Sequence, residues 1–233
     1  PKLWPVVKEA FFPKRDIQEV EFIKIDGPRR AESGAQVPVT FSYDKAAANG
    51  VDIKKIYVIV DANPIQLAAT YHLTELLGNF NMETRIRMET DSFVRLVGET
   101  ADGKLYMAKR EIRAAGGCGG TVENDEAKTR AEAGKIKMNV EEPVKVGAIN
   151  TAVFNIRHVM RTGLQRDLVS QGFVPAFYIN KTDFKFIKSP LKNYAKHFSF
   201  YQHVSIKLCL WHNSRLEIGG ATSSFSDLEL PRP

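Results

Sequence analysis

The sequence predicts an all-β protein made of two β-sandwich domains in tandem, joined by a flexible linker of glycine and charged residues. Short runs that alternate apolar and polar residues recur along the 233-residue chain, turn-forming pieces separate them, and helical periodicity is rare. A glycine-rich and then charged stretch divides the runs into two sets of roughly a hundred residues, which is a common domain size.

The first set occupies residues 1–115, where we expect an immunoglobulin-like sandwich preceded by a short helix. The apolar face of this helix would consist of Trp4, Val7, Ala10 and Phe11. Strands are expected at residues 19–26, 36–43, 53–61, 68–76, 82–90, 92–100 and 104–114. The pieces DKAAANG and ADGK between them are typical of turns and favour antiparallel pairing.

The second set occupies residues 135–233 and predicts a second sandwich of the same kind. Its expected strands are residues 135–140, 148–160, 176–187, 198–212 and 214–219. Between the two sets, residues 116–134 begin with GGCGG and continue with mostly Glu, Lys, Ala, Thr and Arg. This composition cannot bury much surface, so we expect a solvated linker with at most a transient helical turn.

Composition excludes several classes of function. The net charge of +6 is modest and scattered, without the basic stripe and interleaved aromatic residues of a nucleic-acid binder. No apolar run approaches the roughly 20 residues that span a bilayer. The first residues are too polar for the centre of a signal peptide, so we expect a mature chain whose targeting segment has been removed.

Cys118 is the first candidate functional residue. It lies between two pairs of glycines, Gly116 and Gly117 on one side and Gly119 and Gly120 on the other, which offer it no side chains to pack against. A cysteine kept for packing has apolar neighbours, and an exposed thiol is open to oxidation. We therefore interpret this stretch as a flexible arm that presents a sulfur for covalent attachment or redox chemistry.

Cys209 lies in the expected strand VSIKLCLWHN. Two interpretations stay open, a partly covered strand residue beside Trp211 or a disulfide partner of Cys118. The five histidines show no HExxH or CxxC spacing, and the chain has no GxSxG, phosphate-binding or dinucleotide-binding motif. A nucleophile on a glycine arm lacks the fixed geometry that catalysis needs. We therefore expect a protein without metal or cofactor that presents a substrate and is not an enzyme.

The stretch HVMRTGLQRD ends an expected strand with a basic, glycine-containing turn. One interpretation is a docking surface formed by Arg157, Arg161 and Arg166. The other is a solvated turn in which Asp167 pairs with an arginine.

These motifs resemble the SoxYZ sulfur-oxidation carrier of bacteria, which consists of two small β-sandwich proteins. The first half is similar to SoxY through ESGAQVPVTF, DANPIQLAATYHL, DGKLYMAKREI and GGCGG. The second half is similar to SoxZ through IRHVMRTGLQRD and VPAFYINKTDFKF. The fused layout resembles the carriers found beside quinoprotein (PQQ-dependent) dehydrogenases.

The resemblance implies a periplasmic, non-catalytic carrier that binds a thiosulfate-derived sulfur covalently on Cys118. In the thiosulfate-oxidising systems, a haem protein couples thiosulfate to the carrier cysteine, a hydrolase removes sulfate, and a sulfur dehydrogenase oxidises the remaining sulfur. The implied partners are therefore such enzymes with their c-type cytochromes, or a quinoprotein dehydrogenase. The carrier would be a monomer or a dimer linked through Cys118.

Two alternatives of another class remain. The chain could be an interaction module of a quinoprotein dehydrogenase system, whose binding would survive Cys118→Ser. It could also be a thiol redox protein that cycles Cys118 with Cys209 or with a small thiol. A redox pair of Cys118 and Cys209 requires that the Cα atoms of the two cysteines lie roughly 4.4–6.8 Å apart in the disulfide.

Overall fold

The computed structural model describes residues 3–73, 77–117, 119, 121–122, 126–140, 149–187, 193–200, 204–211 and 222–227, and from residue 180 onward their backbone alone. Its elements are α1 (Trp4–Phe11), β1 (Ile17–Glu19), β2 (Ile23–Asp26), β3 (Val37–Tyr43), β4 (Ile53–Val60), β5 (Leu67–His72), β6 (Leu77–Ile86), β7 (Ser92–Thr100), β8 (Leu105–Ile112), β9 (Thr121–Val122), α2 (Glu126–Glu132), β10 (Lys135–Val140), β11 (Ile149–Arg157), β12 (Arg166–Asp167), β13 (Phe177–Ile187), β14 (Asn193–Phe200), β15 (Val204–Trp211) and β16 (Thr222–Asp227). The predicted β-rich class with two sandwich halves is confirmed.

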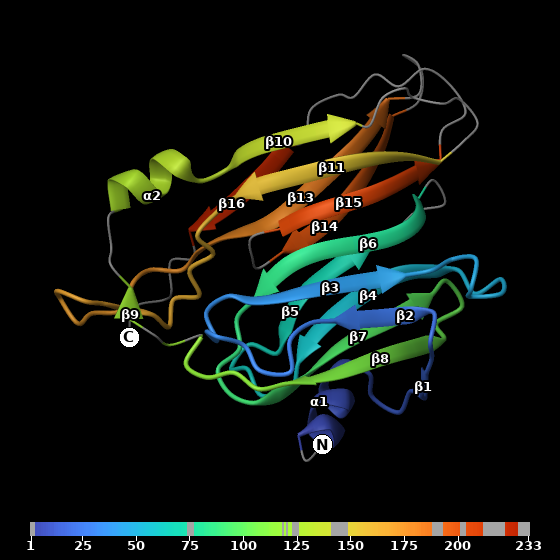
Figure 1. Cartoon of the computed structure of the whole chain (residues 1–233), viewed down its shortest axis with the longest axis horizontal. Coiled ribbons are helices and arrows are strands. Elements are labelled where there is room, and N and C mark those ends of the chain that lie inside the picture. The colour runs from blue at the N-terminus through green and yellow to red at the C-terminus, as the bar shows by residue number, and fades with distance from the viewer. Residues whose placement is uncertain are drawn as a thin grey trace.

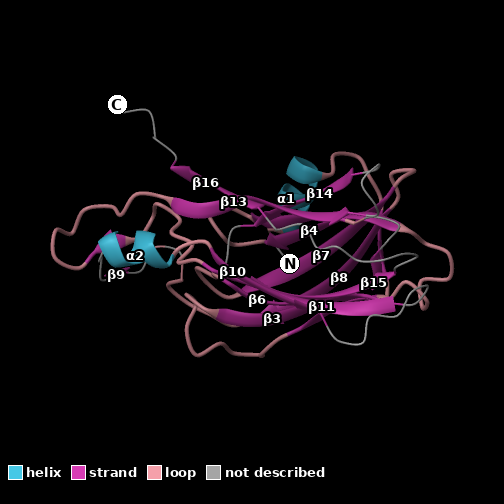
Figure 2. Cartoon of the chain, turned by 90° about the horizontal axis from the view of Figure 1, so that it is seen from above, coloured by secondary structure: helices cyan, strands magenta, loops and turns pink. Residues whose placement is uncertain are grey.

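Two large sheets form the layers of the molecule, and Figure 2 shows them one above the other. One sheet has eight strands in the order β1-β8-β7-β4-β5-β14-β13-β16. The other has six strands in the order β10-β11-β15-β6-β3-β2. Each half of the chain therefore contributes strands to both layers, as a sandwich requires.

The two sandwiches are joined edge to edge, as Figure 1 shows where β6 lies beside β15. In one layer β5 pairs antiparallel with β14, with Tyr71 opposite Phe198. In the other layer β6 pairs antiparallel with β15, with Met82 opposite Ile206. Both sheets therefore continue from the first half of the chain into the second, and the edges that separate sandwiches would expose are paired.

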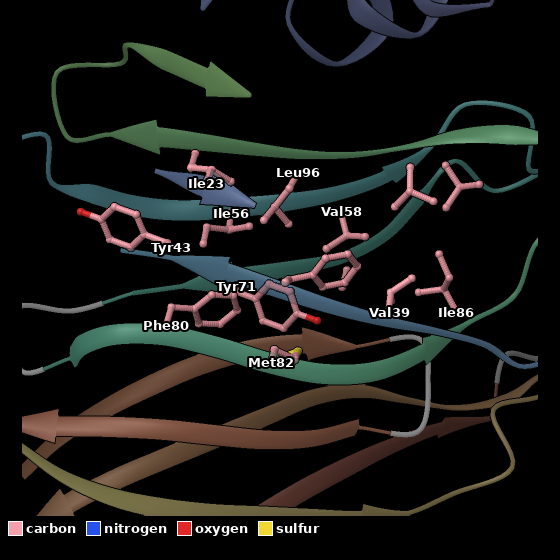
Figure 3. Close-up of a cluster of buried hydrophobic side chains, with 14 of the residues drawn as sticks. Ile23, Val39, Tyr43, Ile56, Val58, Tyr71, Phe80, Met82, Ile86 and Leu96 are labelled. Atoms are coloured by element: carbon pink, nitrogen blue, oxygen red, sulfur yellow. The ribbon is translucent and has the colours of Figure 1, made fainter. Parts of the chain in front are cut away.

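The main core lies between the two layers (Figure 3). β4 supplies Ile56 and Val58, and the facing β6 supplies Phe80 and Met82, all without measurable exposure. The core continues past the pairing between the halves, because Ile179 on β13 belongs to the same cluster. Alternation along the strands explains this arrangement, since every second side chain faces the opposite sheet.

α1 covers the outer face of the eight-stranded sheet, where a second cluster forms. Pro5 stands at the start of the helix, where the absence of its N–H costs nothing. Val7 is buried against Ile59 and Leu105, which explains why β4 is apolar on both faces. Ala10, predicted on the apolar face, is exposed, because the chain leaves the helix and buries Phe12.

The remaining differences from the predicted strands are local. The expected run at residues 19–26 is divided into β1 and β2, and β1 pairs parallel with β8, although antiparallel pairing was expected. The expected run at 198–212 is divided between β14 and β15, and β16 was not predicted. The expected strand at 214–219 lies outside the described residues. Part of the linker forms α2.

No helix in the described part of the chain is long and apolar enough to cross a membrane.

Candidate functional site

The stretch GGCGG follows β8 and leads to β9 and α2, which lie together at one end of the molecule in Figure 1. Gly116, Gly117 and Gly119 belong to the described residues. Cys118 and Gly120 lie outside them, so the geometry of the site is that of the backbone on either side of the cysteine.

The first two glycines are bonded to the turn that follows β6. Gly116 N donates to Glu89 O at 2.8 Å, and Gly117 N donates to Met88 O at 3.0 Å. Arg87 Nη1 donates to Gly117 O at 3.1 Å. The backbone is therefore fixed up to the residue before Cys118.

The close approach of two backbones accounts for the glycine at position 117. A Cβ there would overlap Gly34 O and lie 2.6 Å from Met88 O, so no side chain fits without a backbone shift. Gly116 has a φ of +68°, in the left-handed region that glycine adopts without strain. We expected these glycines to provide freedom, whereas Gly117 permits a tight, buried attachment.

A side chain holds the backbone beyond the cysteine. Glu89 Oε2 accepts a hydrogen bond of 3.2 Å from Gly119 N. Asn63 fixes the turn that carries this glutamate, because Asn63 Nδ2 donates to Arg87 O at 2.7 Å and Glu89 N donates to Asn63 Oδ1 at 3.0 Å. Backbone and side chain of Glu89 thus bind the glycines on both sides of Cys118.

The second half of the chain takes part in this attachment. Arg87 Nη2 donates to Val159 O at 3.4 Å, so one guanidinium joins Gly117 to the chain after β11. A Cβ on Gly119 would meet Leu164 O at 3.8 Å. Directly after the glycines, β9 pairs in parallel with β12, with Thr121 opposite Arg166. The stretch is therefore held between the two halves of the protein.

The three arginines expected to form a docking surface have different surroundings. Burial removes Arg161 from such a surface, because it is 5% exposed and its backbone exchanges two hydrogen bonds with Phe177, of 2.7 and 3.1 Å. Arg166 is exposed and lies over the ring of Phe173 at 4.7 Å. The Arg157 side chain lies outside the described residues, while its backbone pairs with Lys135 in β10.

Asp167, next to Arg166, organises its turn. Its carboxylate accepts hydrogen bonds from Ser170 N at 2.7 Å, from Ser170 Oγ at 2.9 Å and from Val169 N at 3.1 Å. The hydrogen bonds from Ser170 lower the pKa of Asp167, and the nearby charge of Arg161 adds to this effect. The pairing of Asp167 with an arginine stays a prediction.

Cys209 lies in β15, near the end of the β6–β15 pairing that is remote from Gly117. The β6–β15 register shifts around it, between Leu208 opposite Phe80 and Leu210 opposite Leu77. Phe80 is near the start of β6, whereas Arg87, which binds Gly117, follows the end of that strand. Ile86 is six positions after Phe80, which corresponds to about 20 Å at roughly 3.3 Å per residue. Gly117 and Cys209 are therefore at opposite ends of β6.

Sequence reasoning missed Gly34, Asn63, Arg87 and Glu89. Gly34 lies in a turn-forming piece, and Asn63 in the short turn DANP. The run METRIRMET, which contains Arg87 and Glu89, was interpreted only as a strand. No local pattern marks these residues, because their function depends on chain segments far apart in sequence.

Within the described residues, no group of three or more His, Cys, Asp or Glu side chains is arranged to hold a metal ion.

Comparison with known proteins finds two family models that each match a part of the chain. Residues 8–118 match the model "Sulfur oxidation protein SoxY", and residues 136–199 match the model "Sulphur oxidation protein SoxZ". Similar solved structures include the sulfur carrier protein SoxY from Chlorobium limicola f thiosulfatophilum, with 26% identity over 48% of this chain and 92% of that one, at a TM-score of 0.39. A comparison with curated proteins finds no match.

Proposed function

We propose that this fusion of a SoxY domain with a SoxZ domain is a non-catalytic carrier that holds a sulfur substrate, derived from thiosulfate or a related anion, covalently on Cys118. The carrier would work in the periplasm and present its sulfur to partner enzymes and c-type cytochromes of a sulfur-oxidation system. Both family matches support a role in sulfur oxidation.

The observation that carries this proposal is the end of the SoxY match. The matched region closes at residue 118, on the cysteine between the glycine pairs. The backbone geometry supports a presented residue, since Gly116 and Gly119 are exposed while Gly117 is buried between them and bonded to Arg87. We expect a large partner to reach the Cys118 thiol without unfolding of either sandwich.

The backbone on both sides of Cys118 is attached to the protein, and this restricts the shape of a partner's active site. The chain continues through β9 and α2 into the second half, so the arm is a loop and has no free end. A partner therefore receives two strands of backbone, and we expect its active site to lie in an open cleft. A narrow channel suits only a free chain terminus.

The mass of the native protein tests the carrier function. The protein is taken from the periplasm without reductant, and its intact mass and the Cys118 peptide are measured. We expect a sulfane or thiosulfonate adduct on Cys118 that disappears in Cys118→Ser and persists in the matched control Cys209→Ser. A free thiol at Cys118 in actively oxidising cells contradicts the carrier, and absence from the periplasm contradicts the location.

The form of the thiol redox alternative that pairs Cys118 with Cys209 loses support from the β6 geometry. Gly117, the neighbour of Cys118, and Cys209 are at opposite ends of a strand whose relevant length is about 20 Å, far beyond the Cα separation of a disulfide. Detection of a Cys118–Cys209 peptide in the same mass experiment would restore that alternative.

The fused layout favours a second candidate, an accessory module of a quinoprotein dehydrogenase system. That function predicts partner binding which Cys118→Ser leaves intact. The carrier predicts that the same substitution abolishes turnover.

A further inference from the structure

We propose that the 161–174 loop of the SoxZ half is a docking surface, which inserts its apolar tip into a recess beside the active site of the enzyme that acts on the sulfur at Cys118. This inference rests on the proposed function. It adds a second contact, separate from the cysteine, through which the enzyme recognises its carrier.

Position is the first argument. The chain that leaves Cys118 runs along this loop, because Gly119 approaches Leu164 O and Thr121 pairs with Arg166. Figure 2 shows the loops of this region projecting beyond the two layers at the end that carries β9 and α2. An enzyme that surrounds Cys118 must therefore contact this loop as well.

Exposed apolar side chains are the second argument. Seven large apolar side chains are exposed in the described part of the chain, and four of them lie here: Leu164, Leu168, Val169 and Phe173. Val169 is 92% exposed and Phe173 63%. Apolar side chains gathered on one loop mark an interaction site, whereas single ones scattered over a surface need no explanation.

Internal order of the loop is the third argument. The Asp167 carboxylate fixes the tip through its three hydrogen bonds from Val169 and Ser170. At the base, Gln165 is 1% exposed, and its Oε1 accepts a hydrogen bond of 2.8 Å from Thr162 N. A tip that is already ordered loses little conformational entropy on binding, which is the property of a recognition surface.

Arg166 defines the chemistry of the partner. Its guanidinium lies over the Phe173 ring at 4.7 Å and donates from Nη1 to Gln171 O at 3.2 Å, while the residue remains exposed. A guanidinium held by these two contacts suits a carboxylate with two parallel acceptors. The surface that fits the loop is therefore an apolar recess with an acidic residue at its rim.

Val169→Asp tests the proposal, because Val169 is almost fully exposed and its replacement leaves the core unchanged. The carrier is loaded with tetrathionate: the Cys118 thiolate attacks an inner sulfur, Cys118–S–S–SO₃⁻ forms, and thiosulfate leaves with the electron pair of the broken S–S bond. The probe enzyme is the purified sulfate-releasing hydrolase of the same organism. It breaks the sulfur–sulfonate bond, water supplies the fourth oxygen of sulfate, and the electron pair stays on the Cys118 persulfide.

We expect Val169→Asp to raise the KM for loaded carrier at least about tenfold with kcat unchanged, since a carboxylate would enter an apolar recess. The matched control is Val6→Asp on α1, where Val6 is 70% exposed. Its KM should equal that of the wild type. Alkylation of Cys118 by iodoacetamide should proceed at one rate in all three proteins, because that reagent needs no docking.

Three outcomes overturn the inference. One is an unchanged KM in Val169→Asp, and another is a loaded wild type from which the hydrolase releases no sulfate. The third is a dimer of the wild type that Val169→Asp dissociates, which would make the tip a contact between two copies of this chain. The carrier function is judged separately, by the adduct found on Cys118 in the native protein.

Discussion

At position 117 the backbone passes so close to Gly34 and Met88 that only a residue without a side chain fits there. The neighbouring Gly119 has no such constraint, since its nearest atom, Leu164 O, would be 3.8 Å from a Cβ. Two glycines that look equivalent in the sequence therefore have different physical roles, close approach in one case and an open position in the other.

This difference can be measured with alanine at each position. We expect Gly117→Ala to lower the free energy of unfolding by about 1–3 kcal/mol, because the backbone at Gly34 or Met88 must shift to admit the methyl group. Gly119→Ala is the matched control and should stay within about 0.5 kcal/mol of the wild type. Equal stability of the two variants in urea unfolding would show that position 117 is not a tight contact.

At the residue scale, Asp61 and Arg95 form a buried ion pair. Both side chains are 4% exposed, and Arg95 Nε donates to Asp61 Oδ1 at 2.8 Å. The Arg95 guanidinium lies 3.9 Å from the centre of the Trp4 ring, so the same cation contacts α1. Such a pair fixes the position of the helix more than it adds to stability, because desolvation offsets the attraction.

At the scale of elements, α1 and the following turn are also connected to the sheet through Glu99 on β7. Arg15 Nη2 donates to Glu99 Oε1 at 2.8 Å, and Tyr57 Oη on β4 donates to Glu99 Oε2 at 2.6 Å. Burial by itself would raise the pKa of Glu99, but the hydrogen bonds from Tyr57 and Arg15 outweigh it and lower that pKa below its usual 4.5.

This connection predicts a pH dependence. Because the folded-state pKa of Glu99 is lowered, its stabilising effect is complete above about pH 4.5 and is lost as the pH falls through the folded-state value. The stability advantage of the wild type over Glu99→Gln should therefore be constant from pH 7 to 5 and decrease as the pH falls below about 4.5 in urea titrations. Glu111→Gln, at an exposed position, is the control. An advantage that does not decrease as the pH falls below about 4.5 would contradict the assignment.

At the scale of the whole molecule, the linker is not what holds the halves together. Two strand pairs, β5 with β14 and β6 with β15, join them in both layers, and the core continues from one half to the other through Ile156 and Ile179. We therefore expect the two halves to associate without the linker. Its strand β9 pairs with β12, and this pairing places the arm beside the 161–174 loop.

Cleavage of the linker tests this arrangement. A protease site inserted between Ala127 and Lys128, both exposed in α2, should allow complete cutting while the fragments elute together at the position of the intact protein in gel filtration. The continuous sheets and shared core supply the binding energy. Separate elution of the fragments without denaturant would show that the linker, and not strand pairing, holds the halves. The uncut insertion variant is the control.

Strand periodicity was enough to predict most of the fold, and glycine placement singled out the candidate cysteine. Alternation between apolar and polar residues is a local property, and it located β3, β4, β7 and β10. Two divided strands and β16 were missed, since the ends of a strand depend on where its partners end. The stretch around Cys118 was recognisable because a cysteine between four glycines is a pattern of neighbouring residues, visible without knowledge of any tertiary contact.

The sequence by itself therefore determined the β-rich class, the division into two sandwiches and the position of the candidate cysteine. Only the tertiary structure decided that the sandwiches share both sheets, that Arg87 and Glu89 hold the glycine stretch, that Arg161 is buried and that the 161–174 loop lies beside the arm. The physical reason is the distance along the chain over which each kind of interaction acts. Alternation and turn chemistry act between residues close along the chain, whereas strand-edge pairing, backbone close approach and burial depend on residues brought together only by folding.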